Sequence, residues 1–276
     1  MSMVSISTTI ACCMTLFVSL ALPVLVLILF AANYRKQGIL SAWLLGAAGF
    51  FVTQVLIRLP ILTALQNQSW FLSFSQKHLF GYAFSLAFTA GLFELAGRFA
   101  VARLMRKKLT CRRSLAAGLG HGGIEAMIIV GIAYINNLAY IAMINAGSFD
   151  TVVAQAAAAG MDGSQLELVR TQLVSMSPAL FLLAGFERIL AMTGHLAMSM
   201  LVCYGVAHGK TGICILICLG IHTLMDLTAG ISLVLPQDVA YPIIYAILTV
   251  MAVLSLFVIR GIFRRWKKEV SYASEE

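Results

Sequence analysis

Long apolar stretches follow one another along most of this chain, with short polar segments between them. An α-helix needs about 20 predominantly apolar residues to cross the hydrocarbon core of a bilayer. Seven stretches reach that length, at residues 8–32, 39–65, 79–101, 115–144, 178–206, 211–235 and 240–262. The sequence therefore predicts an all-α fold, a polytopic membrane helix bundle of about seven transmembrane helices, which forms a single transmembrane domain over residues 1–276.

The segment between the fourth and fifth stretches, residues 146–177, has a different pattern. Asp162 or Ser164 can cap a short helix there, because both side chains accept hydrogen bonds from backbone N–H groups at a helix start. The apolar positions of that helix recur at helical spacing and share one face. They are Leu166, Val169 and Leu173. This pattern predicts an amphipathic segment that lies on the membrane surface or over the bundle.

Basic residues gather at alternate ends of the predicted helices. Loops with excess lysine and arginine stay in the cytoplasm. We therefore predict an N-terminus outside the cell, a C-terminus in the cytoplasm and an extracytoplasmic segment 146–177. The alternation holds at every loop and so supports an odd number of spans. The basic ends carry Arg35 and Lys36, six residues within 103–113, His208 and Lys210, and Arg264, Arg265, Lys267 and Lys268.

Composition agrees with a membrane protein. The chain is 61% hydrophobic and 11% charged, and its mean hydropathy is +0.93, whereas a soluble domain has about 25% charged residues. The net charge of +8 would suit a nucleic-acid partner, but the basic residues occupy the positions that orient membrane helices. We expect the lipid bilayer as a partner and no nucleic acid. The six cysteines lie in or beside apolar stretches and are typical of packing residues.

Several ionisable residues lie inside the predicted spans, where a charge is costly and usually functional. A helix rises about 1.5 Å per residue, so depth follows from position in the sequence. Glu125 and His222 each lie 12 residues from the basic end of their helix, which is about 18 Å. His195 lies 13 residues, about 20 Å, from the basic end of its helix. Three side chains from three helices therefore share one depth near the bilayer midplane.

Two of these residues have an ionisable neighbour one helical turn away on the same face. His121 precedes Glu125 by four residues, and Asp226 follows His222 by four. Two neutral imidazoles and a carboxylate are typical ligands of a catalytic zinc ion. We predict a site for Zn²⁺ or another divalent metal. Its expected ligands are His121, Glu125, His195 and His222. A mechanism without metal, with Glu125 as general base and the histidines binding the oxyanion, stays open.

Other intramembrane charges have simpler interpretations. Glu94 and Arg98 are four residues apart and are expected to form an ion pair within one helix. Glu187 lies two turns, about 12 Å, from His195 along a regular helix, so we do not expect it to bind the metal directly. We expect it to pair with Arg58, because an unpaired buried charge is unfavourable.

Three elements of the sequence resemble the YhfC family of bacterial intramembrane metallopeptidases, which is grouped with the CAAX-processing, bacteriocin-processing and PrsW-type membrane proteases. They are Gly118-Leu-Gly-His-Gly-Gly-Ile-Glu125, Glu187-Arg188 with His195, and His222-x-x-x-Asp226. The resemblance covers about residues 94–226. It implies a multi-pass protein of the bacterial plasma membrane that hydrolyses a peptide bond of a membrane-bound peptide or protein substrate. The catalytic residues that it implies are Glu125, His195, His222, Asp226, His121 and Glu187.

The chain departs from the pattern of the CAAX-type members at one motif. The paired glutamates followed by an arginine are absent at 121–125, and Glu94-x-x-x-Arg98 is similar to part of that motif. Glu94 with Arg98 is therefore the alternative base pair to Glu125.

Two other functions are compatible with polar residues inside membrane helices. One is a proton- or ion-coupled transporter, since histidines and carboxylates also form proton relays. The absence of a detectable inverted repeat or of a pair of broken helices argues against it. The other is a non-catalytic membrane scaffold or immunity protein with a protease fold, and the intact His, Glu and Asp positions argue against that. We expect an intramembrane peptidase whose ligands face inward from three helices.

Overall fold

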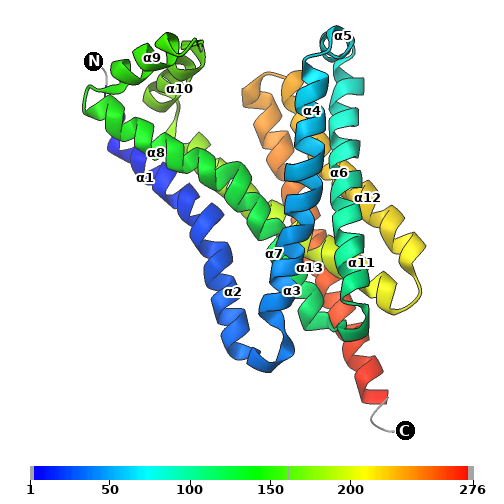
Figure 1. Ribbon diagram of the computed structural model, residues 1–276. Helices are drawn as coiled ribbons and strands as arrows, with labels where there is room; N and C mark the ends of the chain where they lie inside the picture. The colour runs from blue at the N-terminus through cyan, green and yellow to red at the C-terminus, as the bar shows by residue number, and fades with distance from the viewer. Residues whose placement is uncertain (1–2, 161, 273–276) are drawn as a thin grey trace. The chain divides into compact units, whose positions relative to one another are not determined.

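The computed structural model describes residues 3–160 and 162–272, and every regular element in these residues is a helix (Figure 1). Seven helical spans among them are long and apolar enough to cross a membrane, which confirms the predicted helix bundle. Each predicted start, and each predicted end except that of the last helix, lies within four residues of the observed one. The spans are Ile6–Asn33, Ile39–Gln66, Leu79–Leu104, Cys111–Asn145, Pro178–Ala207, Thr211–Leu233 and Gln237–Trp266.

Several spans consist of consecutive helical segments of different kinds. The first four spans contain α1 (Ile6–Leu16), η1 (Phe17–Ala21) and α2 (Leu22–Asn33); α3 (Ile39–Phe50), η3 (Phe51–Arg58) and α4 (Leu59–Gln66); α6 (Leu79–Leu104); and α7 (Cys111–Ala126), η5 (Met127–Gly131) and α8 (Ile132–Asn145). The last three contain α11 (Pro178–Ala207); α12 (Thr211–Leu227) with η6 (Thr228–Leu233); and α13 (Gln237–Tyr272). Shorter helices between spans are η2 (Arg35–Gln37), α5 (Ser69–Lys77), η4 (Arg106–Lys108), α9 (Phe149–Ala158) and α10 (Ser164–Ser175).

The structure adds three features that the hydropathy pattern did not predict. The segments η1, η3 and η5 are π-helical, a form that is rare and is found frequently at functional sites. Ser69–Lys77, in the short segment between the second and third predicted spans, forms α5, and Phe71 packs its ring against that of Tyr82 with the ring centroids 5.7 Å apart. The last helix extends beyond its expected end, and the side chains of Lys267 and Lys268 lie outside the described ones.

The chain divides into two compact units. The first unit comprises Met1–Val24 and Ala126–Ile189, and the second comprises Leu25–Glu125 and Leu190–Glu276. The first, fourth and fifth spans continue from one unit into the other.

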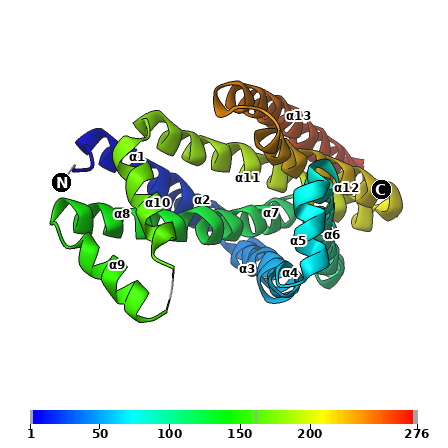
Figure 2. The same ribbon diagram turned by 90° about the horizontal axis from the view of Figure 1, so that it is seen from above.

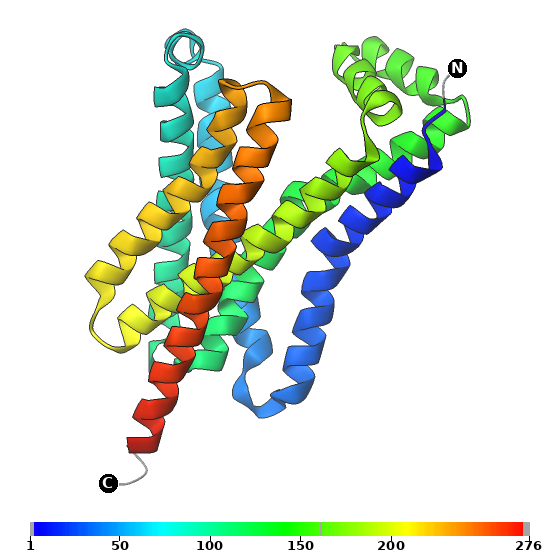
Figure 3. The ribbon, with the colours of Figure 1, turned by 180° about the vertical axis from the view of Figure 1, so that it is seen from behind.

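In the first unit α1 lies along α8, and α9 and α10 pack against α8 (Figures 1 and 3). Leu166, Val169 and Leu173 of α10 all face the apolar core of this unit, which confirms their predicted common face. The start of α10 is held by Asp162, whose carboxylate accepts hydrogen bonds from the backbone N–H of Ser164 at 2.9 Å and from its hydroxyl at 2.6 Å. Both hydrogen bonds lower the pKa of Asp162, and the bond from the Ser164 hydroxyl has the larger effect.

In the second unit α6 packs against α3, η3 and α12 (Figures 1 and 2). Glycines bring α7 very close to its neighbours in this unit. A Cβ atom on Gly120 would lie 2.0 Å from the carbonyl oxygen of Trp43 in α3, and one on Gly122 would lie 2.9 Å from Cβ of His195 in α11. A side chain at either position would separate the helices. The glycine-rich stretch of α7 therefore places His121 and Glu125 within reach of residues on other helices.

Candidate metal centre

The carboxylate of Glu94 on α6 lies at the centre of a buried polar group in the second unit. Its Oε2 atom lies 3.0 Å from Nε2 of His121, 3.6 Å from Nδ1 of His195 and 3.6 Å from Nδ1 of His222. The three imidazoles come from α7, α11 and α12, and each of the three histidines is 1% exposed. Four helices therefore converge on one carboxylate.

Arg98 lies one turn along α6 from Glu94 and forms the ion pair expected from the spacing, at 3.0 Å. The same Nη2 atom lies 2.5 Å from Nδ1 of His195, and Nη1 lies 3.4 Å from Nδ1 of His222. A guanidinium only donates hydrogen bonds. Both imidazoles therefore accept through Nδ1 in this arrangement, and Arg98 balances the charge of Glu94.

The most direct contact between the predicted catalytic residues joins Glu125 and His195. Oε2 of Glu125 lies 2.7 Å from Nε2 of His195, and both side chains are buried. An imidazole nitrogen and a carboxylate oxygen that lie this close together in a buried site are donor atoms that a divalent cation can share.

Four residues of the group present ligand atoms that all lie within 4.8 Å of one another. They are Glu94, His121, Glu125 and His195. Imidazole nitrogens and carboxylate oxygens suit Zn²⁺, and this donor set fits a divalent metal. The set contains Glu94 in place of the expected His222. To hold a metal through Nε2, His195 would carry its proton on Nδ1, which could then no longer accept a hydrogen bond from Arg98.

His222 and Asp226 form a second contact at the edge of the group. Nε2 of His222 lies 3.2 Å from Oδ2 of Asp226, one turn along α12 as expected. The Asp226 side chain is 33% exposed, whereas those of Glu94, His121, His195 and His222 are at most 6% exposed. The contact leaves Nδ1 of His222 facing Arg98 and Glu94, and Asp226 marks the most accessible side of the group.

Glu187, which the family motif includes, belongs to the first unit, whereas the residues of this group belong to the second. The helix α11 is continuous over both residues, so Glu187 lies two turns, about 12 Å, from His195 along the axis. It forms an ion pair with Arg188 at 2.5 Å within the first unit. Arg58, its expected partner, donates to the carbonyl oxygen of Leu86 at 2.7 Å in the second unit. Glu187 and Arg58 therefore each have a partner other than the one that was expected.

One contributor to the site was missed at the level of sequence. Nε2 of Gln54, in η3, donates to Oε1 of Glu94 at 2.8 Å. The sequence feature that could have identified Gln54 is its uncharged amide inside an apolar span, four residues before Arg58.

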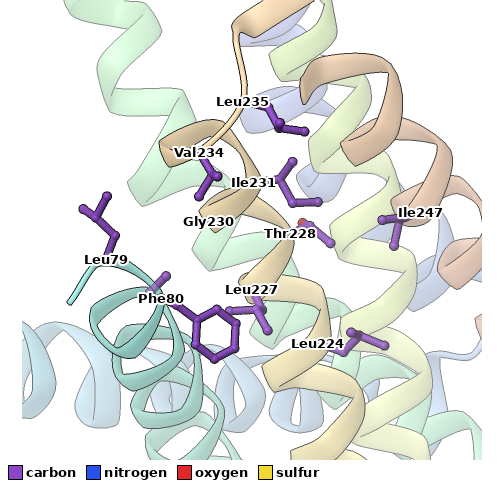
Figure 4. Close-up of a pocket in the computed structure, with 11 residues that line it drawn as sticks. Leu79, Phe80, Leu224, Leu227, Thr228, Gly230, Ile231, Val234, Leu235 and Ile247 are labelled. Atoms are coloured by element: carbon purple, nitrogen blue, oxygen red, sulfur yellow. The ribbon is translucent and has the colours of Figure 1, made fainter. Parts of the chain in front are cut away.

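A separate apolar cavity of about 450 Å³ lies among α6, α12, η6 and α13 (Figure 4). Thr228 is the polar side chain in its lining, and its hydroxyl donates to the carbonyl oxygen of Met225 at 2.6 Å. Among the described residues, no ionisable side chain lines this cavity, so the candidate site is the group around Glu94.

Fold and site together define a class, a helical membrane protein with a buried cluster of His, Glu and Arg side chains within its spans. The chain belongs to the YhfC intramembrane metalloprotease family, whose model matches residues 18–249, and the predicted family is thus confirmed. It is 26% identical to the uncharacterized membrane protein YhfC of Bacillus subtilis (strain 168), over 90% of this chain and 94% of that protein. No solved structure matches the chain.

Proposed function

We propose that the protein is an intramembrane peptidase, which hydrolyses a peptide bond of a membrane-bound peptide or protein substrate. The observation that carries the proposal is the 2.7 Å contact of Glu125 with His195 inside a buried group of two glutamates and two histidines. Ionisable side chains inside membrane spans are costly, and they mark functional sites by default. The family description supports hydrolysis as the function.

Glu94, His121 and His195 would hold the metal ion, with Glu125 beside them, and Zn²⁺ is the ion that this donor set suits best. When bound, a divalent metal supplies a Lewis acid and lowers the pKa of water toward neutrality. His222 and Asp226 are proposed to act beside this set, because His222 reaches Glu94 and Arg98 with one nitrogen and Asp226 with the other.

Glu125 is proposed as the general base that takes a proton from the attacking water. In the alternative base, Glu94, both carboxylate oxygens already contact other side chains. Its Oε1 accepts from Gln54, and its Oε2 contacts Arg98 and His121 at 3.0 Å each. A carboxylate held by that many groups is suited to a fixed, charged role. Arg98 is proposed to stabilise negative charge that develops on the substrate carbonyl oxygen, as preorganised donors do in acyl transfer.

The bacterial plasma membrane is the proposed location, and the lipid bilayer is the medium of the reaction. The seven apolar spans and the membrane-protein relative support this assignment. No part of the proposal involves nucleic acid.

Metal analysis and peptide cleavage on the same preparations test the proposal. Wild-type protein, His195→Ala and His78→Ala are purified in detergent, their bound metal is measured, and they are reconstituted with a pool of single-span membrane peptides. His78 is exposed at the start of α6 and serves as a matched histidine control.

We expect wild type and His78→Ala to retain metal and to generate new peptide termini, and a chelator to stop the cleavage. His195→Ala should lose both properties. Equal cleavage by wild type and His195→Ala would refute the proposed site. Cleavage that needs His195 but survives chelation would favour the glutamate mechanism without metal.

A further inference from the structure

A glutamine outside the predicted catalytic set donates a hydrogen bond to Oε1 of Glu94, the carboxylate oxygen that does not contact the histidines. Gln54 lies in the π-helical segment η3 and is 5% exposed. Its Nε2 atom donates to Oε1 of Glu94 at 2.8 Å and to the carbonyl oxygen of Ala90 at 3.3 Å. Both acceptors belong to α6. The amide therefore binds the same helix at the carboxylate and one turn before it.

The orientation of this amide is set from its other side by Arg58. Nη1 of Arg58 donates to Oε1 of Gln54 at 3.3 Å, and Nη2 donates to the carbonyl oxygen of Leu86 at 2.7 Å. A guanidinium has only donors, so it must face the amide oxygen. The amide NH₂ group must then face Glu94. Arg58, itself anchored on α6, thus leaves Gln54 a single favourable orientation.

We infer that Gln54, oriented by Arg58, is a positioning residue that fixes the carboxylate plane of Glu94. With Oε1 held by Gln54, Oε2 turns toward Arg98 and His121, where it contacts both at 3.0 Å. This inference rests on the proposed function in one respect, because the orientation of Glu94 matters for metal only if Glu94 is a ligand. Partners that orient a ligand typically contribute about 10- to 100-fold to metal affinity.

A general packing role does not account for these contacts. Burying an amide costs free energy unless its hydrogen bonds are made, and an apolar side chain of the same size would fill the space without that cost. The neighbouring Thr53 satisfies its hydroxyl locally, on the carbonyl oxygen of Gly49 at 2.8 Å. Gln54 instead reaches across to another helix and to a charged group.

The test uses Gln54→Met, which keeps the length of the side chain and removes its donors. Gln54→Glu, which sets a second carboxylate against Glu94, is the second variant, and Thr53→Val is the matched control on the same segment. Each substitution is made in the wild type and in Glu94→Gln. One readout is the infrared carboxylate band of Glu94, which is the band that disappears in Glu94→Gln. The other readout is the affinity for Co²⁺.

We expect Gln54→Met to shift the Glu94 band and to weaken Co²⁺ binding about 10- to 100-fold. Gln54→Glu should weaken it at least as much, and Thr53→Val should change neither readout. In the Glu94→Gln background the substitutions at 54 should have no further effect on Co²⁺ affinity. A purely structural role would weaken binding equally in both backgrounds and would overturn the inference.

An unchanged Glu94 band in Gln54→Met would overturn it as well. If the wild type binds no Co²⁺, the proposed metal site fails. The infrared band then decides the inference alone, a shifted band supporting it and an unshifted band refuting it.

Discussion

The interiors of the two units use polar side chains in different ways. In the first unit hydroxyl groups bond to one backbone carbonyl, that of Phe181, which accepts from Thr15 at 2.7 Å and from Tyr134 at 3.0 Å. In the second unit, charged and ionisable side chains contact one another around Glu94. Neutral hydrogen bonds suffice to join membrane helices. The charged group of the second unit is therefore where the proposed chemistry is expected.

The largest effect that follows from this comparison is expected for Glu125→Gln in the second unit. The substitution keeps the size of the side chain and removes the proposed base, so the initial rate of peptide cleavage in vesicles should fall by about 10²- to 10⁴-fold. The unfolding temperature should stay close to that of the wild type. Glu167→Gln, on the exposed face of α10, is the matched control. Cleavage by Glu125→Gln at the wild-type rate would make Glu94 the base.

A smaller effect is expected for Gly122→Ala. The added Cβ would lie 2.9 Å from Cβ of His195, so α7 and α11 must separate, and overpacking of this kind costs about 1–3 kcal/mol. Thermal unfolding in detergent measures the loss, and cleavage should fall with it because His195 moves. Gly261→Ala has open space around it and should leave both unchanged or slightly raise the stability. Equal behaviour of the two variants would contradict the close helix approach.

Tyr134→Phe tests the first unit. It removes one neutral hydrogen bond to the carbonyl oxygen of Phe181, and bonds of this kind in membranes contribute about 0.6 kcal/mol. Thermal unfolding should show this small loss, whereas the cleavage rate should not change. A variant that keeps its stability and loses cleavage would show that the first unit takes part in the chemistry.

The smallest effect is expected for Asp162→Ala at the start of α10. Because hydrogen bonds from Ser164 lower the pKa of Asp162 in the folded protein, its contribution is present above the pKa of the unfolded chain. That contribution is lost as the pH falls through the folded pKa. Amide exchange of residues 164–168 should be faster in Asp162→Ala at neutral pH and equal to wild type in acid. Equal exchange at both pH values would refute the capping role.

Sequence predicted the spans well because a membrane helix needs a long apolar stretch, and such stretches are visible without any knowledge of packing. The helix at Ser69–Lys77 was missed since it is short and mixes polar with aromatic residues. The π-helical segments were missed for another reason. They change the hydrogen-bond pattern of a helix and leave its hydropathy unaltered.

The depth argument placed Glu125, His195 and His222 in one layer, and the structure brings all three to the same polar group. The depth argument gave no reason to put Glu94 at the centre of the group, because an ion pair with Arg98 already accounted for a charge at that position. Spacing within a helix also carries no information on which helices are neighbours. Gln54 was passed over because an uncharged amide stands out little in an apolar span.

The spacing of the polar residues has a consequence for how this protein enters the membrane. Helices are inserted before the bundle has formed, and an isolated charge in a single helix opposes insertion. Glu94 and Arg98 already neutralise each other one turn apart in the third span, and His222 has Asp226 in the sixth. In these two spans each charge thus has a local partner. A substitution that removes only one member of such a pair should therefore impair membrane insertion as well as the proposed reaction. The amount of inserted protein must be compared between variants before their cleavage rates are compared.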